Sequence, residues 1–218
     1  MSHQAAAPLL VAGFEPFGGE SINASWQVAL ALHGRQIAGA PVVAVLLPCA
    51  FGAALEVLRG ALNEHRPQLV LALGQAVGRC ALSLERVAIN VDDARIADNA
   101  GRQPIDEPVV PGAVAAYFST LPIKAMVAAL RGAGVPAEVS STAGTYVCNH
   151  VFFGLQHALA GSAVRSGFMH LPLLPEQAAR STGQPSLPLK TMVDGVALAL
   201  AVAVQQRNDL RLTGGTLD

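Results

Sequence analysis

The chain has 218 residues, of which 52% are hydrophobic and 13% are charged. Its 14 basic and 15 acidic residues leave a formal net charge of -1, which gives no electrostatic basis for binding nucleic acid or an anionic membrane. The three cysteines are an odd number, which argues against a secreted disulfide framework and favours a reducing, cytoplasmic setting. So apolar a chain is expected to bury surface inside an α/β sandwich or between subunits.

Apolar runs alternate with helical patterns along the whole sequence. This alternation predicts an α/β protein, a three-layer α/β/α sandwich around a mainly parallel sheet, in a single domain spanning residues 1–218. The runs that favour strands are 8–13, 41–47, 68–73, 81–91, 135–140 and 165–171. The helical patterns are 25–33, 52–65, 122–132, 149–160 and 189–207.

Two segments carry neither pattern. Residues 92–112 are rich in Asp and Pro, and residues 174–188 form a second stretch of this kind. Both are predicted to be long loops, and long loops in a domain of this kind are often functional. The late apolar stretch 195–204 is far shorter than the roughly 20 residues that span a bilayer.

Cys148 is the first candidate for chemistry. The preceding turn at Ala143 and Gly144 and the helical pattern from about Asn149 place its thiol at a helix N-terminus. The helix dipole there stabilises a thiolate, and the unpaired N–H groups form a hole for an oxyanion. The alternative is a buried structural thiol, which is how we interpret Cys49 and Cys80.

A thiol nucleophile needs a neighbouring imidazole to take and return its proton. His170 ends the strand-like run SGFMH, and the carboxyl ends of strands are where open α/β sheets build their sites. His150 and His157 lie on the predicted helix after Cys148, where packing or a hydrogen bond explains them. His170 is therefore the candidate base, although a lone histidine at such a place is more often structural.

Glu85 is the candidate that orients the imidazole. It lies inside the apolar run ALSLERVAIN, where a carboxylate is costly unless it is paired. The adjacent Arg86 is a poor partner because neighbours on a strand point to opposite faces. A histidine would satisfy Glu85, and the pair would complete a Cys-His-Glu triad.

The sequence contains no complete motif for binding a phosphate, a dinucleotide or a metal ion. The stretch GFEPFGG lacks the Lys-Ser/Thr of a phosphate loop, and no dinucleotide fingerprint is present. Asp92, Asp93 and Asp98 do not follow the calcium-loop pattern, and the cysteines and histidines do not match zinc spacing. We therefore expect no metal site.

Four ordered blocks resemble the pyroglutamyl peptidase I (pyrrolidone carboxyl peptidase) family of cysteine peptidases over nearly the whole chain. These blocks are GFEPFGGESINAS, LGQAVGRCALSLERVAINVDDARIADN, AGTYVCNHVFFGLQH and GFMHLPLLPEQ. The resemblance implies a phosphorylase/hydrolase-like α/β/α fold around a mixed, mainly parallel sheet. It also implies no cofactor, a homotetramer, and peptides with an N-terminal pyroglutamate as substrates.

The resemblance also assigns roles to residues. It makes Glu85 the triad acid, Cys148 the nucleophile and His170 the base, and it places Arg95 near the oxyanion. This chain has Ala24 and Ala97 where the family usually has proline, and Val77 where a proline or a small residue is usual. The pyroglutamate pocket falls on Phe14, Phe17, Gln75, Tyr146 and Val147.

Two other functions stay open on the sequence. One is a Cys-dependent amidase that acts on a different small acyl group, and the other is a catalytically silent homologue that binds pyroglutamyl peptides. The intact Cys148, His170 and Glu85 weigh against the silent homologue. Purine nucleoside phosphorylases have a related sandwich, but no phosphate site is recognisable here.

Overall fold

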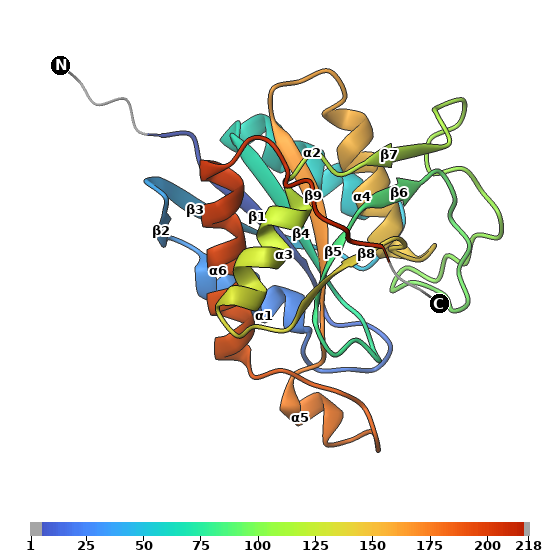
Figure 1. The fold of residues 1–218 in the computed structure, drawn as a ribbon. Coiled ribbons are helices and arrows are strands. Elements are labelled where there is room, and N and C mark those ends of the chain that lie inside the picture. Colours follow the sequence, from blue (N-terminus) through green and yellow to red (C-terminus); the bar gives the residue numbers. More distant parts are fainter. Residues whose placement is uncertain (1–5, 216–218) are drawn as a thin grey trace.

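The computed structural model describes residues 6–215, in which strands and helices alternate along most of the chain (Figure 1). The strands are β1 (Leu9–Phe14), β2 (Gln36–Ile37), β3 (Ala40–Leu47), β4 (Leu69–Gln75), β5 (Leu82–Glu85), β6 (Val87–Ile89), β7 (Ala116–Phe118), β8 (Ala137–Ser140) and β9 (Arg165–Leu171). The helices are α1 (Ala24–Leu32), α2 (Ala53–His65), α3 (Ile123–Gly132), α4 (Val147–Ala158), α5 (Pro175–Ala178) and α6 (Leu189–Gln205).

Seven strands form one sheet in the order β2-β3-β1-β4-β9-β5-β8. The neighbours β3, β1, β4 and β9 run parallel, whereas β5 is antiparallel to β9 and parallel to β8. The short β2 pairs antiparallel with β3, and β6 and β7 form a separate two-stranded ribbon. The predicted mainly parallel, mixed sheet is confirmed.

Helices cover both faces of the sheet (Figure 1). Successive residues of a strand point to opposite faces, so Leu9 and Val11 of β1 pack under α1 and α6, while Leu10 and Ala12 pack under α2 and α4. Strands covered in this way are apolar at every position, which is why β1 and β4 are continuous apolar runs.

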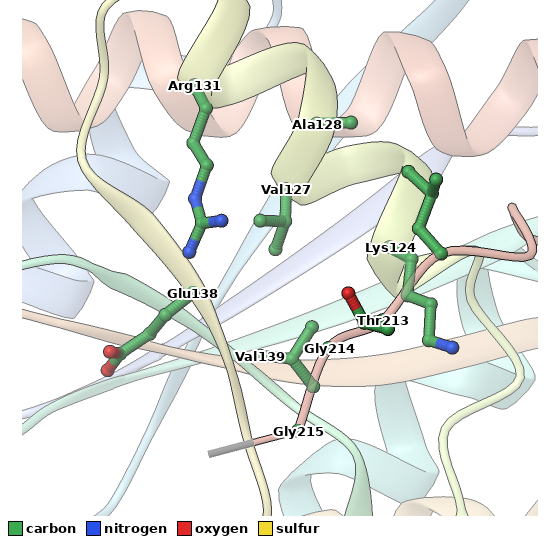
Figure 2. Close-up of a pocket in the computed structure, with 10 residues that line it drawn as sticks. Lys124, Val127, Ala128, Arg131, Glu138, Val139, Thr213, Gly214 and Gly215 are labelled. Atoms are coloured by element: carbon green, nitrogen blue, oxygen red, sulfur yellow. The ribbon is translucent and has the colours of Figure 1, made fainter. Parts of the chain in front are cut away.

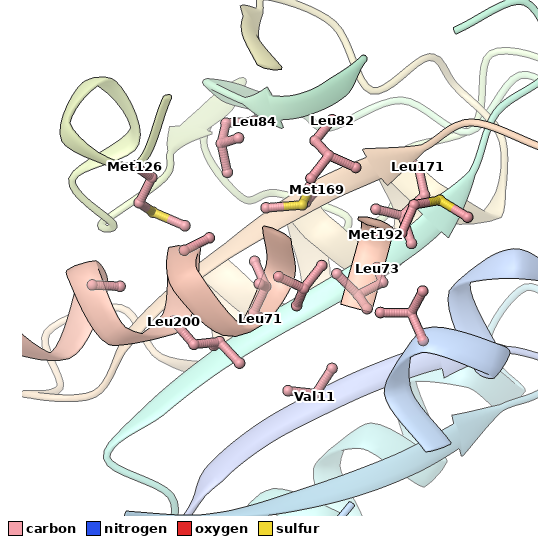
Figure 3. Close-up of a cluster of buried hydrophobic side chains, with 14 of the residues drawn as sticks. Val11, Leu71, Leu73, Leu82, Leu84, Met126, Met169, Leu171, Met192 and Leu200 are labelled. Carbon is pink, nitrogen blue, oxygen red and sulfur yellow. The ribbon is translucent and has the colours of Figure 1, made fainter. Parts of the chain in front are cut away.

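The larger of the two cores lies between the sheet and the helices α1, α3 and α6. Figure 3 shows Met126 of α3 and Met192 of α6 beside Leu71 of β4 and Met169 of β9, and all four side chains are fully buried. They cover the parallel ladder that joins β4 to β9. The pairing matters for function because the carboxyl ends of both strands reach the site described below.

One predicted strand is wrong in its extent. Residues 81–91 form two strands, β5 and β6, which belong to different sheets. The change occurs at Arg86, whose N–H donates to Ser140 O at the end of β8 while its carbonyl accepts from Ser119 N after β7. Because the two sides of Arg86 bond to different segments, residues 81–91 cannot pair as one continuous strand. Local sequence does not reveal this change of partner.

The short elements escaped prediction, and one of them interrupts a segment that was predicted to be a loop. β2, β7 and α5 have four residues or fewer, and α5 lies inside the segment 174–188 that was predicted to be a loop. Residues 92–112 contain no helix or strand, as predicted, and only an isolated bridge joins Asp92 to Glu107. Within residues 6–215, no helix has the length and apolar character needed to cross a membrane.

Candidate active site

Cys148 is the second residue of α4, which begins at Val147, two residues before the predicted start at Asn149. The first intrahelical bond runs from His150 N to Tyr146 O, so the N–H groups before His150 have no acceptor within the helix. Asn149 holds this end of the helix in place. Its fully buried side chain exchanges hydrogen bonds of 3.0 and 2.9 Å with the backbone of Ile89 in β6.

The Cys148 sulfur lies directly over a glycine of β4. A Cβ atom built at Gly74 would lie 2.9 Å from Cys148 Sγ and 2.8 Å from Phe168 Cζ, both closer than real Cβ contacts. Gly74 is also paired in register with His170 on the neighbouring strand β9. The thiol and the imidazole therefore belong to the same level of the sheet.

His170 and Glu85 form a buried hydrogen-bonded pair. Nδ1 of His170 lies 2.8 Å from Oε1 of Glu85, and the two residues have exposed fractions of 4% and 0%. A carboxylate accepts only, so Nδ1 carries the proton and Nε2 of the neutral ring is left with its lone pair. The predicted imidazole partner of Glu85 is confirmed, and Arg86 points elsewhere, to the carbonyl of Gly214.

The surroundings of the Cys148 thiol affect its protonation. Burial raises the pKa of the Cys148 thiol above its ordinary value, and the nearby Cys49 and Glu85 add to the rise. Desolvation thus opposes the thiolate that the helix N-terminus is expected to stabilise. The thiol is neutral near pH 7 and needs a base to become a nucleophile.

A small pocket opens beside the thiol, between the end of β1, the end of β4 and the start of α4. The structure brings all five predicted pocket residues into its wall, together with the predicted nucleophile and two residues to which the resemblance gave no role. The lining residues are Phe14, Phe17, Asn23, Cys49, Gln75, Tyr146, Val147 and Cys148.

Gln75 is fixed in the pocket wall by the backbone of α1. Its Oε1 accepts a 2.8 Å hydrogen bond from Ala24 N, the first residue of that helix. The bond leaves the Nε2 donors of Gln75 for other partners. A proline at position 24, usual in the resembled family, has no N–H and could not make this bond.

Aromatic rings form the outer wall of the pocket. The ring of Tyr146 lies 6.2 Å from that of Phe17 and 5.5 Å from that of Phe51, centroid to centroid. The Tyr146 hydroxyl donates to Ala97 O at 3.1 Å. Tyr146 thereby connects the helix that carries the nucleophile with the long loop 92–112.

That loop is held by one buried carboxylate. Asp98 accepts hydrogen bonds of 2.8 to 2.9 Å from the N–H groups of Phe51, Ala100 and Arg102. Arg95, three residues before it, is exposed, and no hydrogen bond or ion pair joins its side chain to another residue in the range 6–215. The structure therefore does not bring Arg95 to the other predicted site residues.

Two further predictions concern residues outside the triad. His150 is occupied structurally, since its Nε2 accepts from Gly52 N at 2.9 Å and its Nδ1 bonds Asp92 Oδ2 at 2.8 Å. His157 bonds the Tyr117 hydroxyl at 3.0 Å. Cys80 was interpreted as a core residue and is exposed instead, because the turn after β4 carries it outward.

A second pocket lies away from the thiol, between α3, β8 and the C-terminal segment. Figure 2 shows Lys124 and Arg131 of α3 and Glu138 of β8 around it, with Thr213 and Gly214 along one side. It contains none of the predicted site residues. The first pocket is therefore the candidate active site.

Comparison with known proteins agrees with this geometry. Residues 7–206 match the family described as pyroglutamyl peptidase. A pyrrolidone-carboxylate peptidase from Cupriavidus taiwanensis is 58% identical over 212 residues, which cover 96% of this chain and 98% of the relative. The chain belongs to the pyroglutamyl peptidase family. A second relative, from Erwinia tasmaniensis, is 56% identical over 95% of this chain and 97% of its own length.

Solved structures of the family have the same fold. The crystal structure of pyroglutamyl peptidase I from Bacillus amyloliquefaciens superposes with a TM-score of 0.93 at 40% identity, covering 95% of this chain and all of that chain. Pyrrolidone carboxyl peptidase from Thermococcus litoralis gives a TM-score of 0.90 at 37% identity over 95% and 99% of the two chains. The sandwich and its mixed sheet are thus those of a pyroglutamyl peptidase.

Sequence reasoning missed several residues that shape this site. Asn23 and Cys49 line the pocket, and Arg79 contacts the triad acid. Asn149 and Gly74 position the thiol. Only Gly74 carried a local signal, because a glycine near the end of an apolar strand often marks a close approach of another group.

Proposed function

We propose that this chain is a cysteine peptidase that removes an N-terminal pyroglutamyl residue from peptides, with its catalytic machinery in one domain. The observation that carries the proposal is the buried His170–Glu85 pair, which lies in register with the glycine under the Cys148 sulfur. A nucleophile, a base and an orienting acid are thereby collected at one level of the sheet. Family membership supports the same activity.

The chemistry is acyl transfer through a thioester. Nε2 of His170 takes the Cys148 proton as the sulfur attacks the pyroglutamyl carbonyl, and the imidazolium then returns that proton to the departing amine. Water, deprotonated by His170, next attacks the thioester, and the released Cys148 sulfur regains a proton. Glu85 keeps the ring in the required tautomer and stabilises the imidazolium that forms in each half-reaction.

The oxyanion of each tetrahedral intermediate needs hydrogen-bond donors. The backbone N–H of Cys148 lies in the first turn of α4, where N–H groups have no acceptor within the helix. We assign this N–H to the oxyanion. Arg95 is the second donor implied by the family resemblance, and it would have to move from its exposed position on the loop to act there.

The lining of the pocket suits a neutral lactam, although its cavity volume of about 10 Å³ means that the walls must move apart before the ring can enter. Phe14 and Phe17 supply apolar ring surface, and the fixed amide of Gln75 offers its Nε2 donors to the ring carbonyl. Tyr146 and Val147 complete the wall beside the thiol. A peptide with a free N-terminal ammonium would bury an unpaired charge there, so ordinary peptides are rejected.

The test is hydrolysis of a chromogenic pyroglutamyl amide beside the matching prolyl amide. The wild type is expected to cleave only the first. Cys148→Ser is expected to lose at least about a thousandfold in kcat, whereas Cys80→Ser, which changes an exposed thiol, keeps wild-type rates. Binding of the pyroglutamyl amide without cleavage would instead identify a silent homologue, and cleavage of other acyl amides alone would identify a different amidase.

We further propose a homotetramer in a cytoplasmic setting. Three large apolar side chains on β7 and the loop before it are strongly exposed, with fractions of 68% for Phe118, 73% for Ile105 and 54% for Val114. Exposed apolar side chains of this size are typical of protein interfaces. Sedimentation velocity at micromolar concentration is expected to report a tetramer, and a monomer would contradict the proposal.

A further inference from the structure

Arg79 lies in the turn after β4, and its guanidinium contacts the triad acid Glu85 and several groups around it. Nη1 lies 3.3 Å from Ser83 Oγ and 3.2 Å from Glu138 Oε1. Nη2 lies 3.2 Å from Ser140 Oγ, 3.3 Å from Thr142 O and 3.5 Å from Glu85 Oε1. One side chain thus joins the turn after β4 to β5, to β8 and to the segment that leads into the nucleophile helix.

Glu85 has few other partners. Its side chain is fully buried, and Oε1 has the Nδ1 of His170 at 2.8 Å and the guanidinium of Arg79 at 3.5 Å. Oε2 has no hydrogen-bond partner among residues 6–215. The 3.5 Å separation is long for a hydrogen bond, but the two opposite charges still attract each other at this distance, and solvent weakens the attraction only in part because Glu85 is fully buried and the Arg79 side chain is 26% exposed.

The catalytic cycle requires Glu85 to be ionised at two different stages. When His170 is an imidazolium, the ring itself compensates the buried carboxylate. When His170 is neutral, as it must be to accept the Cys148 proton, the ring supplies no charge, and a fully buried carboxylate would tend to bind a proton. A guanidinium is charged at every working pH, so it compensates Glu85 at this stage.

We propose that Arg79 is a positioning residue of the active site, which keeps Glu85 ionised while His170 is neutral and ties the triad acid to the segment before Cys148. The proposal rests on the proposed function. It assigns Arg79 no contact with substrate. Its effect passes through Glu85 to His170.

The charged and titratable groups around Glu85 come from β9, α4, β8 and the turn after β4. His170 faces it from β9, Cys148 from α4, and Arg79 from the turn after β4. Glu138 of β8 shares the guanidinium and accepts from Ser83 Oγ at 2.7 Å. Figure 2 shows Glu138 at the rim of the second pocket, on the side away from Lys124. Arg79 is the nearest cation of this group.

The test measures kcat/KM against pH for a chromogenic pyroglutamyl amide. In Arg79→Gln, the acidic limb is expected to move up by about one pH unit, because both Glu85 and His170 lose a cation that favours their deprotonated forms. The matched control is Arg86→Gln. It removes the cation next to Glu85 in sequence, whose guanidinium instead bonds the Gly214 carbonyl, and the limb is expected to stay in place.

Two further variants keep the test decisive if Arg79→Gln does not fold. Arg79→Lys preserves the charge and is expected to keep the limb within about 0.3 of a pH unit of wild type, while losing rate because one ammonium cannot serve five partners. Glu138→Gln removes the competing carboxylate, and its limb is expected to move to lower pH. A limb that stays in place in Glu138→Gln, or that moves equally in the Gln and Lys variants of Arg79, would overturn the proposal.

Failure of this proposal is distinguishable from failure of the proposed function. If the wild type does not cleave the amide, the function is wrong, and Arg79 is then tested by the titration of the His170 ring in NMR spectra. There, Arg79→Gln is expected to raise the pH at which the ring protonates. If the wild type cleaves the amide and Arg79→Gln has the wild-type pH profile, only the role of Arg79 is wrong.

Discussion

Gly74 leaves no room for a side chain beneath the Cys148 sulfur. The sulfur and the Phe168 ring both lie within 3.0 Å of the place where a Cβ atom would be. The thiol is therefore positioned from two directions, by Asn149 holding α4 to β6 and by a strand that carries no side chain at this point. Placement of a reacting atom to within about an ångström decides rates of this kind.

Gly74→Ala is expected to lower kcat/KM by about a hundredfold, because the new methyl group displaces the sulfur from its place beside His170. Enzyme kinetics on the folded protein measure the effect, with circular dichroism to establish the fold. Gly60→Ala is the control. A Cβ atom at position 60 of α2 would meet no atom of residues 6–215 apart from its chain neighbours and its own helix backbone, so that change is expected to leave kcat/KM unchanged and to stabilise the helix by about 1 kcal/mol. A Gly74→Ala enzyme as active as wild type would contradict this account.

At the scale of elements, the loop 92–112 depends on Asp98 more than on any strand or helix of its own. Three backbone N–H groups converge on this buried carboxylate, one from the turn before α2 and two from the loop. The same loop supplies the carbonyl of Ala97 that holds the Tyr146 hydroxyl. Loss of the carboxylate therefore reaches the pocket wall through Tyr146.

Asp98→Ala is expected to lower the free energy of unfolding by about 3 kcal/mol, since it leaves three N–H groups without their charged acceptor. It is also expected to raise KM for the pyroglutamyl amide several-fold, with a smaller change in kcat, because the triad is not touched. Urea unfolding and steady-state kinetics measure the two effects. Asp93→Ala, at an exposed side chain of the same loop, should change neither quantity. An unchanged KM in Asp98→Ala would show that the loop does not shape the pocket.

At the scale of the whole molecule, burial of thiols makes folding sensitive to alkaline pH. Burial raises the pKa of the Cys49 thiol from its ordinary value of 9.0 to about 12. The unfolded chain loses this proton above pH 9, whereas the folded protein keeps it up to about pH 12. The stabilisation is therefore complete below pH 9 and is lost progressively between these values.

Between pH 9 and pH 11, the free energy of unfolding of the wild type is expected to fall more steeply than that of Cys49→Ala. The difference is about 1.4 kcal/mol per pH unit, the value for one proton held only by the folded state. Urea unfolding at several pH values measures the two slopes. Cys80→Ala, which removes an exposed thiol, should retain the wild-type slope. Equal slopes for wild type and Cys49→Ala would show that Cys49 ionises in the folded protein.

The sequence by itself determined the layers of the fold and the three residues at the centre of the site. Continuous apolar runs such as β1 and β4 require cover on both faces, so the sandwich follows from composition and period alone. Glu85 was recognisable as a site residue because a carboxylate in an apolar strand is costly unless it has a partner. The four sequence blocks that resemble the family then placed Glu85 in one triad with His170 and Cys148.

Only the tertiary structure decided how these residues act. The groups that desolvate the Cys148 thiol and raise its pKa are distant in sequence, and the position of Cys148 at a helix N-terminus gives no information about them. The split of residues 81–91 into two sheets, the exposed place of Cys80 and the guanidinium of Arg79 behind Glu85 have the same origin. Each depends on strands and turns brought together by folding, and local sequence patterns carry no record of such neighbours.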